Sequence, residues 1–198
     1  MSVKTQGLRA IICEDEGVTV MQLKKGLQRA GYSVIGEAVE GSRGVELARE
    51  LEPDFVLMDL TMPGMDGITA TRQIMEERPI PIIILTAYSD QQSVEAALEA
   101  GACAYLVKPI DTSQLIPAVI TAIARFEMME NVKRENATVK EALETRKLVE
   151  RAKGIIMDRK KLTEAEAFRH MQKMSRDKCQ TMKQTATEII NADSILGQ

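Results

Sequence analysis

Short apolar runs alternate with amphipathic segments through the first 124 residues of the chain. The apolar runs are rich in Val, Ile and Leu and short enough to be buried strands: LRAIIC (8–13), SVIGEAV (33–39), DFVLM (54–58), PIIIL (81–85) and CAYLV (103–107). Between them, apolar residues at helical spacing predict helices over 18–29, 42–51, 67–77 and 90–100. This alternation predicts a doubly wound α/β fold with a five-stranded parallel sheet.

A long helix is expected after the fifth apolar run. Asp111 is a suitable N-cap, and residues 112–153 contain one proline, Pro117, and no glycine, so the helix should continue to about residue 157. An earlier capping box is expected at Ser89 and Gln92. Steps of three and four residues join a short seam that fits either a coiled coil or a plain extended helix: Met129, Val132, Asn136, Val139 and Leu143.

The last quarter of the chain shows three further apolar stripes at helical spacing. They start near Val149, at a Thr163–Glu166 capping box, and near Met182, and they predict a small three-helix bundle. Phe168 and the methionines of these stripes are expected in its core. Gly154 interrupts the first stripe, and either close helix packing or the approach of a ligand to bare backbone would explain it.

Charge separates the two halves of the chain. Residues 1–124 carry 10 Lys and Arg against 17 Asp and Glu, a net charge of −7, whereas residues 125–198 carry 16 against 12, a net charge of +4. No run is long and apolar enough to cross a membrane, and the three separated cysteines favour a reducing compartment. We therefore expect a cytoplasmic protein without a membrane-bound segment.

Chemically active side chains follow four of the five expected strands. One acidic residue in such a place is usually a helix cap or a solvated loop residue, but carboxyl ends of parallel strands meet at one edge of a sheet, where ligands collect. The set that would converge there is Glu14, Asp15, Asp59, Thr86 and Lys108. Clustered carboxylates suit Mg²⁺, and Asp59 could then act as a nucleophile toward phosphorus while Lys108 offsets phosphoryl charge.

Residues 8–124 resemble a response-regulator receiver domain, whose fold is the flavodoxin-like sheet. The resemblance implies that Asp59 accepts a phosphoryl group from a sensor histidine kinase and that Mg²⁺ binds Glu14, Asp15, Asp59 and the backbone carbonyl of Thr61. It also implies that Thr86 and Tyr105 form a switch pair beside Lys108. Pro109 is a candidate for a cis peptide bond. No enzymatic activity is expected beyond phosphoryl transfer to Asp59 and its hydrolysis.

A basic helical bundle favours nucleic acid as the partner of the tail, although a solvated surface is a simpler explanation of the charge. The tail lacks the glycine-containing turn that is common in DNA-reading helix-turn-helix motifs. The segment ERAKGIIMDRKKLTEAEAFRHMQKMSRDK (150–178) is similar to the ANTAR domain, a three-helix RNA-binding module, and the similarity covers about residues 145–192. Candidate RNA contacts are Arg151, Lys153, Gly154, Arg176, Lys178 and Lys183.

The two resemblances together predict three parts: a receiver domain (8–124), a helical connector (125–147) and an ANTAR domain (148–192). They imply a response regulator that dimerises when phosphorylated and binds tandem hairpins in leader messenger RNA, thereby controlling transcription antitermination. A DNA-binding regulator and a protein-binding signalling adaptor are the alternative hypotheses.

Overall fold

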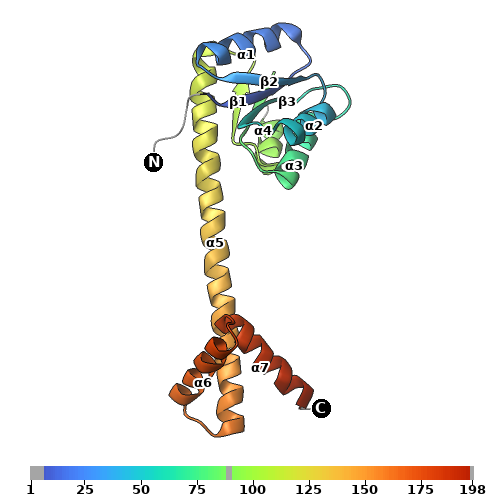
Figure 1. The fold of residues 1–198 in the computed structure, drawn as a ribbon. Helices are drawn as coiled ribbons and strands as arrows, with labels where there is room; N and C mark the ends of the chain where they lie inside the picture. Colours follow the sequence, from blue (N-terminus) through green and yellow to red (C-terminus); the bar gives the residue numbers. More distant parts are fainter. Residues whose placement is uncertain (1–6, 88–90, 197–198) are drawn as a thin grey trace. The chain divides into compact units, whose positions relative to one another are not determined.

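The computed structural model describes residues 7–87 and 91–196 of the chain. These residues divide into two compact units, with the boundary between Glu130 and Asn131 (Figure 1). The capping box expected at Ser89 and Gln92 lies outside this description, because Ser89 does.

The first unit is built on a five-stranded parallel sheet with the order β2-β1-β3-β4-β5. Its strands are β1 (Arg9–Cys13), β2 (Ser33–Ala38), β3 (Phe55–Asp59), β4 (Ile82–Thr86) and β5 (Ala104–Val107). The five strands expected from the apolar runs are confirmed, with ends that shift by one residue. Strand order reverses between β1 and β3, which places the ends of these two strands at the position where such sheets bind ligands.

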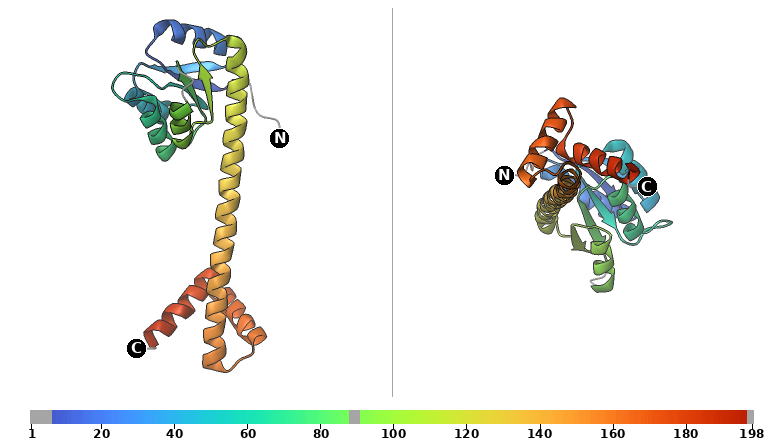
Figure 2. Two further views of the ribbon diagram at one scale, coloured as in Figure 1. Left: turned by 180° about the vertical axis from the view of Figure 1, so that it is seen from behind. Right: turned by 90° about the horizontal axis from the view of Figure 1, so that it is seen from below.

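Helices cover both faces of the sheet, as expected (Figures 1 and 2). On one face, α1 (Gly17–Arg29) and the first turns of α5 (Thr112–Lys160) contribute Leu27 and Leu115 to one apolar core. The other face is covered by α2 (Gly41–Leu51), α3 (Gly67–Glu77) and α4 (Gln91–Glu99). Every residue of β3 and β4 is buried, because strands covered on both faces have no solvent-facing side.

The loop between β3 and α3 is held very close to the strand that precedes it. Asp66 caps α3, since its carboxylate accepts a hydrogen bond of 2.7 Å from the backbone N–H of Thr69. Gly67 begins the helix, and a Cβ atom added there would overlap the backbone carbonyl of Asp59. A glycine is therefore required for the loop to return to the end of β3.

The second unit is a small helical bundle formed by the later turns of α5, by α6 (Glu164–Asp177) and by α7 (Met182–Leu196). Its buried core consists of Ala152, Ile156, Ala167, Met171 and Ala186. The long α5 is confirmed, with Asp111 accepting a hydrogen bond from the N–H of Ser113 at its start. The capping box of Thr163 and Glu166 at the start of α6 is also confirmed.

The expectation that Phe168 lies in the core of the bundle is wrong. Its side chain is 40% exposed, and it is not among the residues of the core cluster. The neighbouring Ala167 and, four residues further on, Met171 take the buried positions on α6. The periodicity of α6 correctly predicted the face that packs against the core. Phe168 lies at the edge of this face, where a difference of one position decides whether a side chain is buried.

Replacing Gly67 by Ala should destabilise the first unit, because the new methyl group would overlap backbone that cannot rotate away. We expect the free energy of unfolding to fall by about 1–3 kcal/mol. Gly17→Ala is the matched control, since a Cβ at Gly17 meets nothing within 4 Å, and its effect should be neutral or stabilising by at most about 1 kcal/mol. Urea unfolding of both variants measures the difference, and equal stabilities would contradict the close approach.

Candidate phosphoryl-acceptor site and nucleic-acid interface

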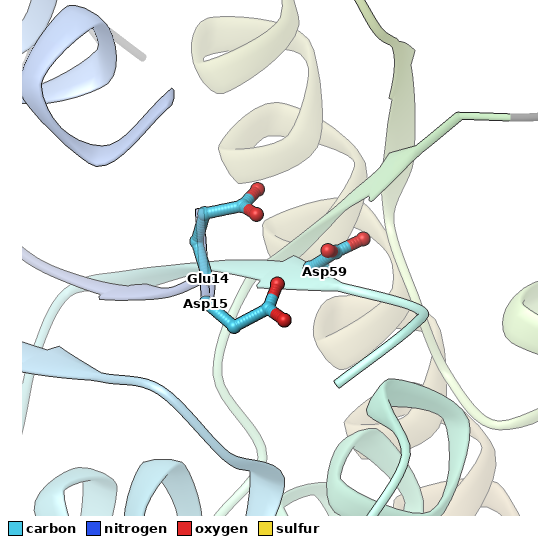
Figure 3. Close-up of side chains that lie close together, drawn as sticks. All are labelled: Glu14, Asp15 and Asp59. Carbon is cyan, nitrogen blue, oxygen red and sulfur yellow. The ribbon is translucent and has the colours of Figure 1, made fainter. Parts of the chain in front are cut away.

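Three carboxylates meet at the carboxyl ends of β1 and β3. Glu14 and Asp15 directly follow β1, and Asp59 is the last residue of β3. The two strands pair in register up to Cys13 and Met58, so the residues that follow are also neighbours. One carboxylate oxygen from each of the three residues lies within 4.8 Å of the others (Figure 3).

Lys108, which follows β5, joins two of these carboxylates. Its Nζ donates hydrogen bonds of 2.8 Å to Oε1 of Glu14 and 2.9 Å to Oδ2 of Asp59. Glu14 is fully buried and Asp59 is nearly so. Burial raises the pKa of Glu14, and the nearby Asp59 carboxylate raises it further, against the lowering effect of Lys108. Burial alone would lower the pKa of Lys108, but its hydrogen bonds to the two carboxylates outweigh burial and raise the pKa.

The cluster has the chemistry of a site for a hard divalent cation. Three carboxylates face a single ammonium group, which leaves negative charge to be compensated. Both oxygens of the buried Glu14 carboxylate lie close to the same ammonium group, at 2.6 and 2.8 Å from Lys108 Nζ. Asp15 is exposed and so gives solvent access to the cluster. Oxygen ligands with retained waters are the usual environment of Mg²⁺, so these residues fit the ion.

The remaining expected receiver residues lie around this cluster or on the neighbouring edge strand. Thr61 N–H donates a hydrogen bond of 3.4 Å to Asp59 Oδ1, and Thr86 is buried at the end of β4. The peptide bond between Lys108 and Pro109 is cis, as expected. Tyr105, on β5, is 48% exposed, so in this structure its ring lies at the surface of the unit.

Several basic residues expected to contact RNA are already paired with carboxylates in the second unit. Lys153 is only 8% exposed, and its Nζ lies 2.7 Å from Glu150 and 2.6 Å from Glu164. These two hydrogen bonds raise the pKa of Lys153. The other pairs are Lys178 with Glu188, at 2.6 Å, and Lys183 with Glu141, at 3.3 Å. Lys153 therefore links α5 to α6 within the bundle.

The other three expected contacts are differently placed. Within the described residues Arg151 has no ion pair, and Arg176 only donates a hydrogen bond to the carbonyl of Gln172 on its own helix. A Cβ added at Gly154 would meet nothing within 4 Å, which shows that close helix packing, the simpler explanation considered for this glycine, is wrong here. Its backbone is partly exposed and open to the approach of a ligand.

Comparison with known proteins assigns both units. Residues 10–120 match the response regulator receiver domain, and residues 137–190 match the ANTAR domain. The transcriptional regulatory protein PdtaR of Mycobacterium tuberculosis is 46% identical over 92% of this chain and 89% of its own length. The chemotaxis protein CheY of Thermotoga maritima is 42% identical over 57% of this chain and 95% of its own length.

Solved structures agree on the fold of the first unit. A chain of the CheX–CheY–BeF3–Mg complex from Borrelia burgdorferi covers 59% of this chain and 89% of its own length, with 31% identity and a TM-score of 0.57. The receiver domain of the response regulator NarL from Mycobacterium tuberculosis covers 60% of this chain and 98% of its own length, with 26% identity and a TM-score of 0.57.

The chain therefore belongs to the response regulators. More particularly, it is a two-component regulator in which a receiver domain is joined to an RNA-binding ANTAR output domain. Receiver domains interact with histidine kinases and bind Mg²⁺ at an acidic site of the kind formed by Glu14, Asp15 and Asp59. None of the helices in the described part of the chain is long and apolar enough to cross a membrane.

Gly154→Ala tests whether this glycine has a packing role. Alanine is favoured over glycine by about 1 kcal/mol inside a helix, and the added methyl group has free space around it. The variant should therefore raise the free energy of unfolding of the second unit by up to about 1 kcal/mol, measured by thermal or urea unfolding monitored by circular dichroism. A loss of stability would show instead that Gly154 is closely packed.

Proposed function

We propose that phosphorylation of Asp59 controls dimerisation of the chain and thereby its binding to tandem hairpins in leader RNA. The hydrogen bonds that Lys108 makes to both Asp59 and Glu14 are the observation that best supports this proposal. They hold a nearly buried carboxylate beside a cation and two further acids, at the edge of the sheet where ligands of this fold bind.

Asp59 is the proposed phosphoryl acceptor of the receiver. One of its carboxylate oxygens attacks the phosphorus of the donor, and the bond between phosphorus and the kinase's leaving group breaks. The negative charge then lies on the phosphoryl oxygens instead of the carboxylate. Lys108 can bind these oxygens, because its ammonium group already contacts Asp59. The same site, with water as the attacking group, hydrolyses the acyl phosphate.

Mg²⁺ is the proposed cofactor of this transfer. Glu14, Asp15, Asp59 and the backbone carbonyl of Thr61 would hold the ion, with Asp15 best placed to meet it from solvent. When bound, the cation offsets charge on the phosphoryl oxygens. The CheX–CheY complex that resembles this receiver contains both BeF3 and Mg, which supports an acidic site that accommodates a phosphoryl-like group together with the metal.

Thr86 and Tyr105 are the proposed switch pair. Phosphorylation of Asp59 replaces a carboxylate of charge −1 by an acyl phosphate of charge about −2, a net gain of about one negative charge, and adds new acceptor oxygens at the ends of β3 and β4. The hydroxyl of Thr86 can then move toward the phosphoryl group and form a hydrogen bond to it. This movement leaves room beside β4 for the ring of Tyr105, which is exposed in this structure. The result is a changed surface at β5 and the adjoining helices, where a second receiver can bind.

Dimerisation is proposed to extend from the receiver (8–124) along the connector (125–147). Val132, Val139 and Leu143 are exposed apolar residues on α5, spaced seven and four residues apart, and at this spacing they can pair with the same residues of a second copy. A dimer then carries two ANTAR domains (148–192). Binding two adjacent hairpins with one dimer raises the effective concentration of the second contact, and the bound hairpins exclude a competing terminator.

Asp59→Asn should abolish phosphorylation and its consequences. The variant should gain no phosphoryl mass with acetyl phosphate or with the kinase, and it should remain in the unphosphorylated oligomeric state. Its affinity for a two-hairpin leader RNA should not rise, whereas that of the phosphorylated wild type should rise about 100-fold or more, the scale of a bivalent gain. Mass spectrometry, light scattering and gel-shift titration measure the three effects.

Asp66→Asn is the control for Asp59→Asn, because Asp66 is an exposed carboxylate that caps α3. It should be phosphorylated normally. Equal RNA binding with and without phosphorylation of the wild type would reject the coupling, and stronger binding to duplex DNA than to hairpin RNA would reject the RNA output.

Asp15→Asn should weaken Mg²⁺ binding. Mg²⁺ at about 100 times its dissociation constant should stabilise the wild type by about 2.7 kcal/mol, because the ion binds only the folded site. Thermal unfolding with and without Mg²⁺ should show that this gain is reduced in Asp15→Asn but retained in Glu16→Gln, a neighbouring carboxylate outside the cluster. A full Mg²⁺ effect in Asp15→Asn would argue against Asp15 as a ligand.

A further inference from the structure

The second unit contains one phenyl ring, and this ring lies at the surface. Phe168 is the only Phe, Tyr or Trp in residues 131–198. Its side chain is 40% exposed, although the unit has a core of small and aliphatic residues in which a ring could have been buried. An exposed phenyl ring is unfavourable in water, so its position on α6 has a cost that a bound partner would offset.

The ring lines an open groove of about 710 Å³ between α5, α6 and the start of α7. Ala142, Val149 and Met182 give the groove an apolar surface, and Val149 and Met182 also pack against the core of the unit. Threonine hydroxyls and charged groups complete the lining: Thr138, Thr145, Thr181, Glu141, Arg146, Glu150 and Lys183. An aromatic face beside hydrogen-bonding and cationic groups is the composition that recognises an unpaired nucleobase with its phosphates.

Two cationic side chains that line the groove, Arg146 and Lys183, can contact the phosphates of a bound RNA. Glu150 is paired with Lys153, so it does not oppose phosphate as a free charge. Arg146 has no ion pair within the described residues. Lys183 is paired with Glu141 at 3.3 Å, but the two side chains are 39% and 70% exposed, so exchanging this solvent-accessible pair for a phosphate costs little. Residues 131–198 carry 15 Lys and Arg against 10 Asp and Glu, a net charge of +5 that attracts RNA.

We propose that Phe168 is a stacking platform for one unpaired base of the bound hairpin loop, with Arg146 and Lys183 contacting the flanking phosphates. The inference rests on the proposed RNA-binding function and adds the part of the RNA that this groove recognises. Bases inside a stem are stacked on one another and cannot reach a protein ring, whereas loop bases can be turned outward. The groove would therefore bind bases of the hairpin loop, and the stem would hold the loop in position.

Substitutions at Phe168 separate the ring from its bulk. The probe is a tandem-hairpin RNA selected on the full-length wild type from a pool with randomised loops, in the presence of Mg²⁺ and acetyl phosphate. Phe168→Leu keeps an apolar side chain without an aromatic face and should weaken binding about 5- to 150-fold, the range for one stacked base. Phe168→Tyr keeps the ring and should bind as the wild type does. Thermal unfolding of each variant checks that the bundle is intact.

Abasic substitutions in the loop identify the stacked base. Removing that one base should weaken binding to the wild type but cause no further loss in Phe168→Leu, because the two changes remove the same contact. Removal of any other loop base should cost both proteins equally. This non-additivity is not expected if the leucine variant merely loosens the bundle, since a structural defect would add to every base removal.

Each result has a distinct meaning. Wild-type affinity in Phe168→Leu, or additive losses at every loop position, would overturn the stacking proposal while leaving the RNA-binding function intact. If the variant instead lost only self-association, the groove would be a protein contact and the proposal would be wrong. Failure of the wild type to select any RNA from the pool would overturn the proposed function and this inference together.

Discussion

Lys108 holds two buried carboxylates, Glu14 and Asp59, close to each other at one edge of the sheet. Like charges in a buried site repel strongly, and the single ammonium group can compensate only part of the charge when Asp15 lies beside them. The loop after β3 and the cis peptide at Pro109 belong to the same arrangement, because both lie directly beside a member of this cluster. An ion or phosphoryl group bound at this edge would therefore change the balance of charge.

In the second unit, several charged groups form separate ion pairs instead of a single cluster. Lys153, Lys178 and Lys183 are each paired with a carboxylate, so part of the unit's positive charge is used in contacts within the bundle. Net charge attracts RNA at long range, but it carries no information about which RNA is bound. The exposed ring of Phe168 and the accessible backbone at Gly154 are surface features that could distinguish one RNA from another, which net charge alone cannot do. Both belong to a unit whose core is formed mainly of small and aliphatic residues.

Much of the fold could be predicted because its periodicity is strong. Runs such as PIIIL occur in strands buried on both faces, and the long interval without glycine indicated α5 correctly. The convergence of Glu14, Asp15, Asp59 and Lys108 could also be predicted, since parallel strands bring their carboxyl ends to one edge. Phe168 could not be placed, because it borders Ala167 on the same helix and a rotation of one position decides whether the ring is covered. The pairing of Lys153 was equally hidden, since Glu164 lies on a different helix.

The sequence by itself determined the receiver and ANTAR domains, the order of strands and helices along the chain, and the set of groups at the end of the sheet. These follow from local periodicity and from the geometry of parallel strands, which any chain with this pattern obeys. Only the tertiary structure decided which lysines are paired with carboxylates, whether Gly154 packs against another helix, and whether the ring of Phe168 is buried. Those properties depend on contacts between helices that are distant in the chain, and the packing of short helices around a small core is not encoded in the period of any one of them.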